Sequence, residues 1–271
     1  KFAGFPLSSG NELNGISFGG VGSGTTVEYV QVHNNSDDGI EMFGGTVDLR
    51  HIVLTGNGDD SMDYTDGWTG RAQFVIVAHH ESEGDQGFEF DNFEDNDDRL
   101  PRSNPMIANF TLVGNPAGSG SDDSDQGMLL REGTAGQLFN GLVVEMGDNC
   151  FDIDDDSTFD RLSGSGSAGD ELLDLQSVAL DCAVNFDESS SDPVDLSTWF
   201  LSRPNNAEYS NTLSGTPFFT GYTGYVPGSA EQALVATDVN AIDSWFVAAD
   251  YVGAVEDAND TWYQGWTFRQ Q

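Results

Sequence analysis

Residues 36–65, SDDGIEMFGGTVDLRHIVLTGNGDDSMDYT, contain the same phrase twice. An aspartate, a small residue and an apolar–acidic–apolar triplet begin at Asp38 and begin again at Asp60, 22 positions later. Related phrases recur along the chain at intervals in the low twenties, with one interval of 40 positions. Two apparent insertions, near 94–105 and 116–124, account for that long interval. A short period of this kind predicts a solenoid, in which each repeat packs on its neighbours.

Each phrase is followed by a second run of β-branched and apolar residues, and the repeats carry almost no helical periodicity. The pattern therefore predicts an all-β, right-handed parallel β-helix with coils of about 22–26 residues. Side chains alternate across a strand, so one member of each triplet should point into a common core. The expected inward stack consists of Ile40, Met62, Phe88, Met128 and Phe151.

The repeats fade after residue 186, and the remaining sequence is rich in turn residues and tryptophan. We therefore expect coils over residues 1–186 and a loop-rich cap, packed on the helix, over residues 187–271. A solenoid needs such a cover because exposed strand edges promote aggregation.

The acidic members of three triplets, Glu41, Asp63 and Glu89, should form a ladder that points away from the core. On adjacent coils these carboxylates would lie about 5 Å apart. Three interpretations stay open: a solvated face, a cation site, or the carboxylate pair of a polysaccharide hydrolase. In the last case an exposed aromatic ring near the ladder would stack on a sugar. The candidate ligand-binding residues are Tyr64, Asp66 and Trp68.

Several loops are rich in closely spaced oxygen ligands, which Ca²⁺ prefers. None has the spacing of an EF-hand. The sequence nevertheless predicts bound Ca²⁺ as a stabilising cofactor. The candidate metal ligands are Asp91, Asp95, Asp97, Asp154 and Asp156.

The chain has 9 Lys and Arg against 46 Asp and Glu, which gives a net charge of −37. Nucleic acids and anionic lipids would be repelled by this surface, so neither is an expected partner. No apolar run is long enough to span a bilayer, and the first residues, KFAGFPLSSG, are expected to belong to a mature or truncated chain. Cys150 and Cys182 would reach bridging distance if their coils are neighbours, and a disulfide is then expected.

The stretches NELNGISFGGVGSGTTVEYVQVHNNSDDGIEMFGGTV, GDDSMDYTDGWTGRAQFVIV and RSNPMIANFTLVG resemble a large group of secreted bacterial proteins. These proteins are common in marine proteobacteria and Bacteroidetes, and are called lipoproteins or parallel β-helix repeat proteins. The resemblance covers nearly the whole chain. It implies an exported β-helix, secreted or on the outer cell surface, with further coils before Lys1 in the full-length protein. It brings no established catalytic residues.

The sequence thus predicts an exported structural, adhesive or carbohydrate-binding protein that is stabilised by calcium. Its expected partner is a polysaccharide or a cell surface. The alternatives are a glycoside-active enzyme that uses the acidic ladder and an extracellular filament formed by end-to-end self-association.

Overall fold

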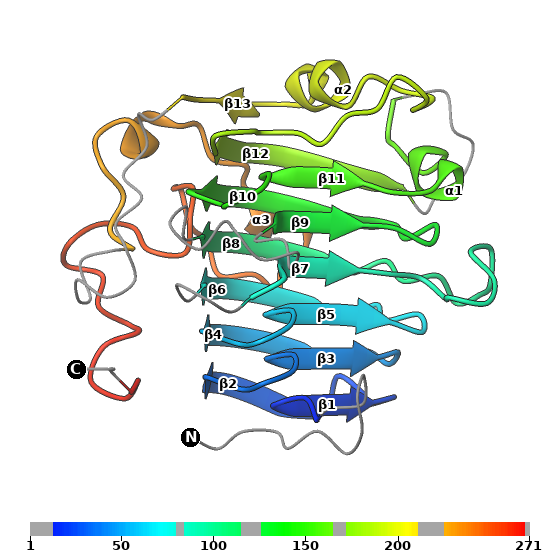
Figure 1. The fold of residues 1–271 in the computed structure, drawn as a ribbon. Helices are drawn as coiled ribbons and strands as arrows, with labels where there is room; N and C mark the ends of the chain where they lie inside the picture. The colour runs from blue at the N-terminus through cyan, green and yellow to red at the C-terminus, as the bar shows by residue number, and fades with distance from the viewer. Residues whose placement is uncertain (1–12, 80–83, 115–125, 165–171, 211–224, 269–271) are drawn as a thin grey trace.

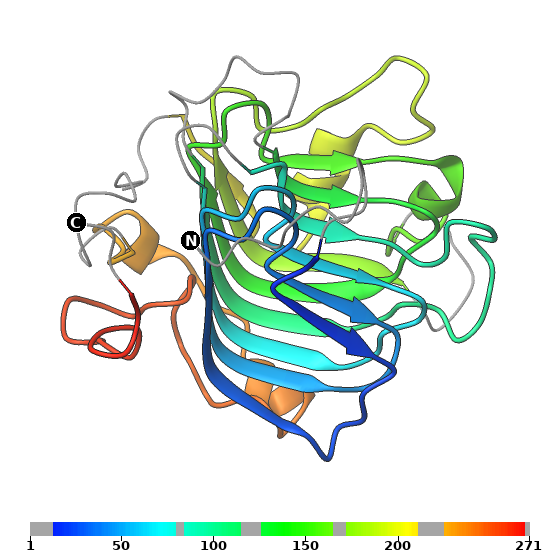
Figure 2. The same ribbon diagram turned by 60° about the horizontal axis from the view of Figure 1, so that its bottom comes forward.

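The computed structural model describes residues 13–79, 84–114, 126–164, 172–210 and 225–268. Within these ranges the chain passes back and forth between two parallel sheets that lie face to face (Figures 1 and 2). The six-stranded sheet contains, in spatial order, β1 (Ile16–Gly19), β3 (Ile40–Phe43), β5 (Met62–Thr65), β7 (Gln86–Phe90), β9 (Gln126–Leu130) and β11 (Phe151–Ile153). The seven-stranded sheet contains β13 (Ala207–Glu208), β12 (Leu173–Asp181), β10 (Gly136–Val144), β8 (Met106–Val113), β6 (Arg71–Ala78), β4 (Asp48–Thr55) and β2 (Thr26–His33).

The strand register confirms the inward stack. Each apolar residue pairs with its equivalent on the next strand, although 22, 26, 40 and 23 positions separate them along the chain. All are at most 1% exposed and belong to one continuous core between the sheets. The stack is Ile40, Met62, Phe88, Met128 and Phe151. The second predicted insertion, near 116–124, lies outside the described residues.

Every long strand from β2 to β12 bends at one shared position. The residue there has a φ between 52° and 62°, a left-handed conformation that is uncommon for residues other than glycine. Strand pairing is interrupted at this residue and resumes directly after it. We call this set the bend column: Tyr29, His51, Phe74, Asn109, Asn140 and Ser177.

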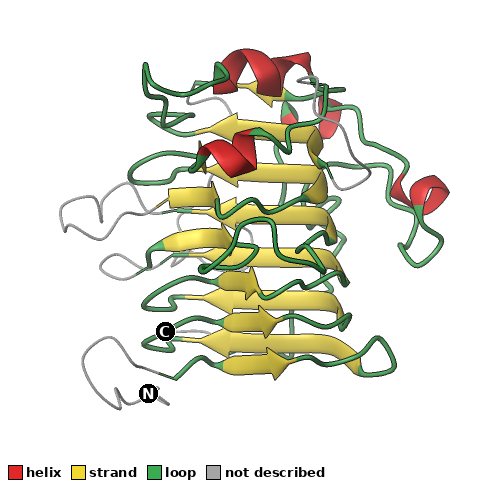
Figure 3. Ribbon diagram, turned by 90° about the vertical axis from the view of Figure 1, so that its right-hand side faces the viewer, coloured by secondary structure: helices red, strands yellow, loops and turns green. Residues whose placement is uncertain are grey.

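A disulfide joins Cys150 and Cys182, as predicted, with their Cα atoms 5.7 Å apart. Cys150 directly precedes β11 and Cys182 directly follows β12, and Figure 1 shows these strands near the end of the stack where α2 (Leu196–Ser202) lies. Phe200 of α2 is fully buried and packs against Phe151, the last member of the inward stack, at a ring-centroid distance of 6.1 Å. Helix α1 (Asp156–Phe159) follows β11 at the same end (Figures 1 and 3). Strand pairing continues beyond residue 186, because β13 pairs with β12.

The last described segment, residues 225–268, returns along the outer face of the seven-stranded sheet (Figure 1). It contains the 3₁₀-helix η2 (Glu231–Ala233) and α3 (Val239–Ile242). Asn140 on β10 exchanges hydrogen bonds of 2.8 and 3.0 Å with the backbone of Thr237. Near the other end of the stack, Gln31 on β2 bonds the backbone of Phe268. The segment therefore covers the side of the stack from β10 to β2, and its contact is not confined to the last coils.

Candidate functional site

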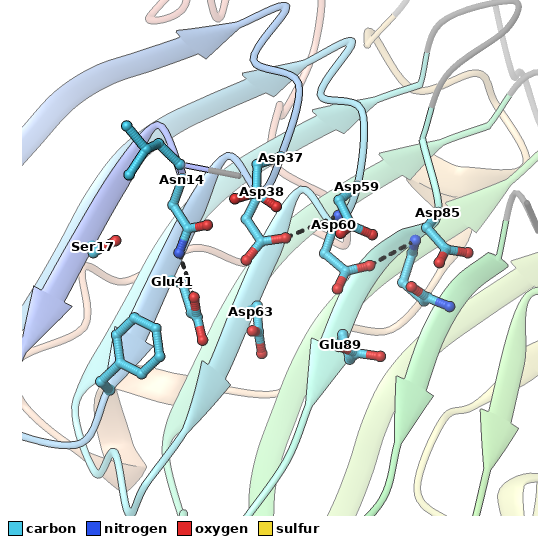
Figure 4. Close-up of a pocket in the computed structure, with 13 residues that line it drawn as sticks. Asn14, Ser17, Asp37, Asp38, Glu41, Asp59, Asp60, Asp63, Asp85 and Glu89 are labelled. Atoms are coloured by element: carbon cyan, nitrogen blue, oxygen red, sulfur yellow. Dashed lines mark hydrogen bonds between the residues drawn. The ribbon is translucent and has the colours of Figure 1, made fainter. Parts of the chain in front are cut away.

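Two columns of acidic side chains meet on the six-stranded sheet. Glu41, Asp63 and Glu89 occupy one register position on β3, β5 and β7, and alternation turns them away from the core. Asp38 and Asp60 lie in the turns that precede β3 and β5. Figure 4 shows the two columns side by side in one pocket. Three further carboxylates line it, two from the same turns and one directly before β7: Asp37, Asp59 and Asp85.

The turn aspartates hold successive coils together. The backbone N–H of Asp60 donates to Oδ1 of Asp38 at 3.2 Å, and the backbone N–H of Gln86 donates to Oδ1 of Asp60 at 2.9 Å (Figure 4). These hydrogen bonds run from one coil to the next. Each turn aspartate also stands three residues before a strand acid, Glu41 or Asp63. That repeated spacing is the signal that would have placed both columns in one site.

The strand acids are buried although they point away from the core. Glu41 is 9% exposed and Asp63 is 8% exposed, so the interpretation as a solvated face is wrong for these two. The reason is that the turn column stands beside them. Glu41 accepts a hydrogen bond from the Asn14 side chain, and Glu89 pairs with Arg131 at 2.8 Å. Oδ1 of Asp63, between them, is buried and has no hydrogen-bond partner.

Burial raises the pKa of all five acids in the two columns, Asp38, Asp60, Glu41, Asp63 and Glu89. Loss of solvent, with the charges of neighbouring carboxylates, raises the pKa of Asp38 to about 9. Burial also raises the pKa of Glu89 to about 7, although the nearby Arg131 charge opposes the shift. The pKa values of Asp60 and Asp63 lie well above the usual range, first because of burial and then because of neighbouring carboxylates. At neutral pH such a group either keeps protons or is neutralised by a cation.

The spacing of the carboxylates suits a cation. Two oxygens on opposite sides of a Ca²⁺ ion, each at about 2.4 Å, are about 4.8 Å apart. Among the described residues, four groups of three acids place one oxygen from each member within 4.8 Å of the others. All four groups belong to this pocket. They are Asp37/Asp38/Asp59, Asp38/Glu41/Asp63, Asp59/Asp60/Asp85 and Asp60/Asp63/Glu89.

The acidic row has a defined length. Glu41 pairs in register with Ser17 on one side, so the row does not continue onto β1. On the other side Glu89 pairs with Leu129. Arg131 lies at this end and also binds Asp91 at 2.9 Å. The continuous row therefore runs over β3, β5 and β7 and their preceding turns, and an acid returns at this register position on β11, where Asp152 pairs with Leu129.

Two of the predicted sugar-contacting residues are inaccessible. Tyr64 and Trp68 are both 0% exposed, so neither ring can stack on a ligand, and this prediction is wrong. Tyr64 follows the alternation into the core, where its hydroxyl donates to the carbonyl of Ala135 at 3.1 Å. The Trp68 indole N–H donates to the carbonyl of Val47 at 3.1 Å. Asp66 is exposed, but it follows β5 and lies at the opposite end of that strand from the turn aspartates.

The predicted calcium loops lie apart from this pocket. Asp91 is bound by Arg131, and Asp95 lies 3.5 Å from Arg99. The other three candidates come together around a second pocket near α1, beside Asp155 and Asp192. They are Asp97, Asp154 and Asp156. Among the described residues, no group of three oxygens within 4.8 Å includes any of the five predicted ligands.

Taken together, the stacked parallel sheets, the inward ladder and the carboxylate pocket define a parallel β-solenoid with an acidic site on its short-stranded sheet. The chain belongs to the pectate-lyase-like β-helix domain family, whose match spans residues 1–216. No curated protein and no solved structure shows significant similarity to the chain. None of the helices in the described ranges is long and apolar enough to cross a membrane.

Proposed function

We propose that this protein is an exported right-handed β-helix whose acidic pocket binds Ca²⁺, and that it acts in association with extracellular carbohydrate. The family fits an extracellular or carbohydrate-related role. The observation that carries the cation-binding proposal is Asp63, which is buried among carboxylates with an oxygen that accepts no hydrogen bond. A hard cation would satisfy that oxygen and remove the repulsion within the pocket.

The proposal moves calcium from the predicted loops to the pocket. An exposed carboxylate is solvated by water and gains little from a cation, whereas a buried one without a partner is costly. Asp95, Asp154 and Asp156 are exposed. Asp38, Asp60 and Asp63 are each less than 9% exposed. The free energy gained from a bound cation is therefore larger in the pocket.

The test is calorimetric titration of chelator-treated protein with Ca²⁺, together with thermal melts. Calcium should bind and raise the melting temperature by linkage. Asp63→Asn keeps the shape of the side chain and should weaken binding by about tenfold or more. Asp66→Asn, an exposed aspartate at the other end of the same strand, is the matched control and should bind as the parent does. Absence of both binding heat and thermal stabilisation in the parent would refute the proposal.

The hydrolase alternative loses one of its supports, because neither Tyr64 nor Trp68 can form an aromatic sugar platform. It is tested with a reducing-end assay on neutral and acidic polysaccharides, using the same two variants. Release of sugar by the parent and by Asp66→Asn, but not by Asp63→Asn, would favour an enzyme over a binding protein.

A further inference from the structure

Two of the four carboxylate groups share one residue. Asp63 belongs both to the group with Asp38 and Glu41 and to the group with Asp60 and Glu89. In register it pairs with Glu41 on one side and with Glu89 on the other. The two groups are therefore successive steps along the stack, roughly one strand spacing of about 4.8 Å apart.

The two outer strand acids have partners outside the acidic columns, whereas one oxygen of Asp63 has no partner. Asn14 holds Glu41, and Arg131 holds Glu89. Oδ1 of Asp63 is buried and accepts no hydrogen bond. An ionised carboxylate has two oxygens and about four lone-pair sites, so it can bind a different cation through each oxygen.

The charges match two divalent cations. The two groups contain five different carboxylates: Asp38, Glu41, Asp60, Asp63 and Glu89. Arg131, which pairs with Glu89, supplies one positive charge. Four negative charges are then left, and a single divalent cation would neutralise only half of them. The remaining acids of the pocket occur only in the other two carboxylate groups and stand outside this pair: Asp37, Asp59 and Asp85.

We infer that the pocket binds two divalent cations side by side along the stack, bridged by the Asp63 carboxylate. This inference rests on the proposed cation binding and adds the number of ions and their shared ligand. Each ion takes one turn aspartate and one outer strand acid, and both ions take Asp63.

The test adds Mn²⁺ to chelator-treated protein. Mn²⁺ is a divalent cation that prefers oxygen ligands and gives an electron paramagnetic resonance signal. An isolated bound Mn²⁺ gives a six-line spectrum, whereas two ions that share a carboxylate are magnetically coupled and lose it. We expect at least two equivalents to bind, with the coupled spectrum appearing as the second site fills.

Two variants each remove a ligand from one of the two cation sites. Glu41 occurs only in the first of the bridged groups and Glu89 only in the second. Glu41→Gln and Glu89→Gln should each keep one Mn²⁺ with an uncoupled six-line spectrum, while Asp63→Asn abolishes coupling and weakens both sites. Circular dichroism melts of each variant establish that it is folded.

The outcomes separate the two proposals. If the parent binds one Mn²⁺, or several that keep six-line spectra, the bridged pair is wrong and cation binding in the pocket still holds. If neither Mn²⁺ nor Ca²⁺ binds at all, the proposed function is wrong and this inference falls with it.

Discussion

Gly39 shows how tightly the turns of this stack are packed. It precedes the inward triplet of β3, and a Cβ atom built on it would lie 2.4 Å from the carbonyl oxygen of Ser61 on the next coil. The turns are equally tight three coils further along the stack, where a Cβ on Gly127 would lie 2.3 Å from the carbonyl oxygen of Cys150. The turns can therefore approach each other closely enough for the aspartate-to-backbone bonds to form.

Gly39→Ala should consequently destabilise the fold by about 1–3 kcal/mol, the usual cost of overpacking. Gly19→Ala is the control, because a Cβ there has nothing within 4 Å. Chemical denaturation of the two variants measures the difference. Equal stabilities would mean that the turns are looser than described.

His51 illustrates a second constraint on single residues. It lies in the bend column between Tyr29 and Phe74, with ring-centroid distances of 4.4 and 5.0 Å, and its Nδ1 is buried with no hydrogen-bond partner. Burial, with the adjacent Arg50 charge, lowers the pKa of His51 to about 4. The unfolded chain, with a histidine pKa near 6.5, therefore takes up a proton before the folded chain does. This residue destabilises the fold as the pH drops from about 6.5 to about 4.

His51→Phe should remove that acid sensitivity. Phenylalanine is compatible with this left-handed backbone, because Phe74 has a φ of 62° at the equivalent position. The difference in melting temperature, variant minus parent, should be larger at pH 5 than at pH 7. A difference that does not change with pH would contradict the assignment, and effects common to both proteins, including those of the acidic pocket, cancel in the comparison.

At the scale of the strands, alternation carries most of the prediction from sequence. The triplets of β3, β5, β7 and β11 place apolar residues at every second position, and these are the residues that stack inward. Alternation also turns Glu41, Asp63 and Glu89 away from the core, as expected. It says nothing about what stands beside the outward face, and for that reason the burial of the strand acids by the turn column was not predicted.

The long strands show the corresponding limit. Their β-branched runs identify them as strands, but the bend column has no shared residue type: it contains two aromatic residues, a histidine, two asparagines and a serine. A pattern of residue types cannot reveal a feature defined by the backbone. The path of residues 225–268 depends on that column, because the side chains of Asn109 and Asn140 donate hydrogen bonds to backbone carbonyls of this segment. It was therefore not predictable either.

Phe88 is the central test of the strand stack. It is fully buried on β7 and packs against Phe90 and Phe110 at ring-centroid distances of 4.9 and 5.3 Å. Phe88→Ala should cost about 3–5 kcal/mol, because the cavity is enclosed by strands of both sheets. Phe43→Ala, at a 38% exposed phenylalanine on β3, is the control and should cost much less. Denaturant midpoints that shift equally in the two variants would contradict the register of β7.

At the scale of the whole molecule, the raised carboxyl pKa values determine how stability depends on pH. A carboxyl group whose pKa is higher in the folded chain contributes stability that is fully present below its unfolded pKa and is lost as the pH rises through its folded pKa. For Glu89 the folded pKa is about 7, and for Asp38 it is about 9. The loss therefore extends from weakly acidic to alkaline pH. Relief of the overall charge of −37 on acidification acts in the same direction.

The cation-free protein should therefore melt at a higher temperature at pH 5 than at pH 9, in the presence of chelator. The double variant Asp38→Asn/Asp63→Asn removes two of the groups responsible and should show a smaller change between these pH values. Calcium added at pH 8 should raise the melting temperature of the parent, because it replaces the protons. If the melting temperature of the parent is the same or higher at pH 9, the carboxylates of the pocket do not destabilise the fold by repelling one another.

The register of the stack also has an evolutionary consequence. Phe88 and Met128 remain paired although 40 positions separate them, so residues added between two strands leave the pairing of those strands intact. A tandem duplication of one coil is a different genetic event, because it copies a turn aspartate and its strand acid together. Such a duplication would extend the pocket by one complete step, with no new side chain to be selected. The capacity of such a site would then follow the copy number of one gene segment.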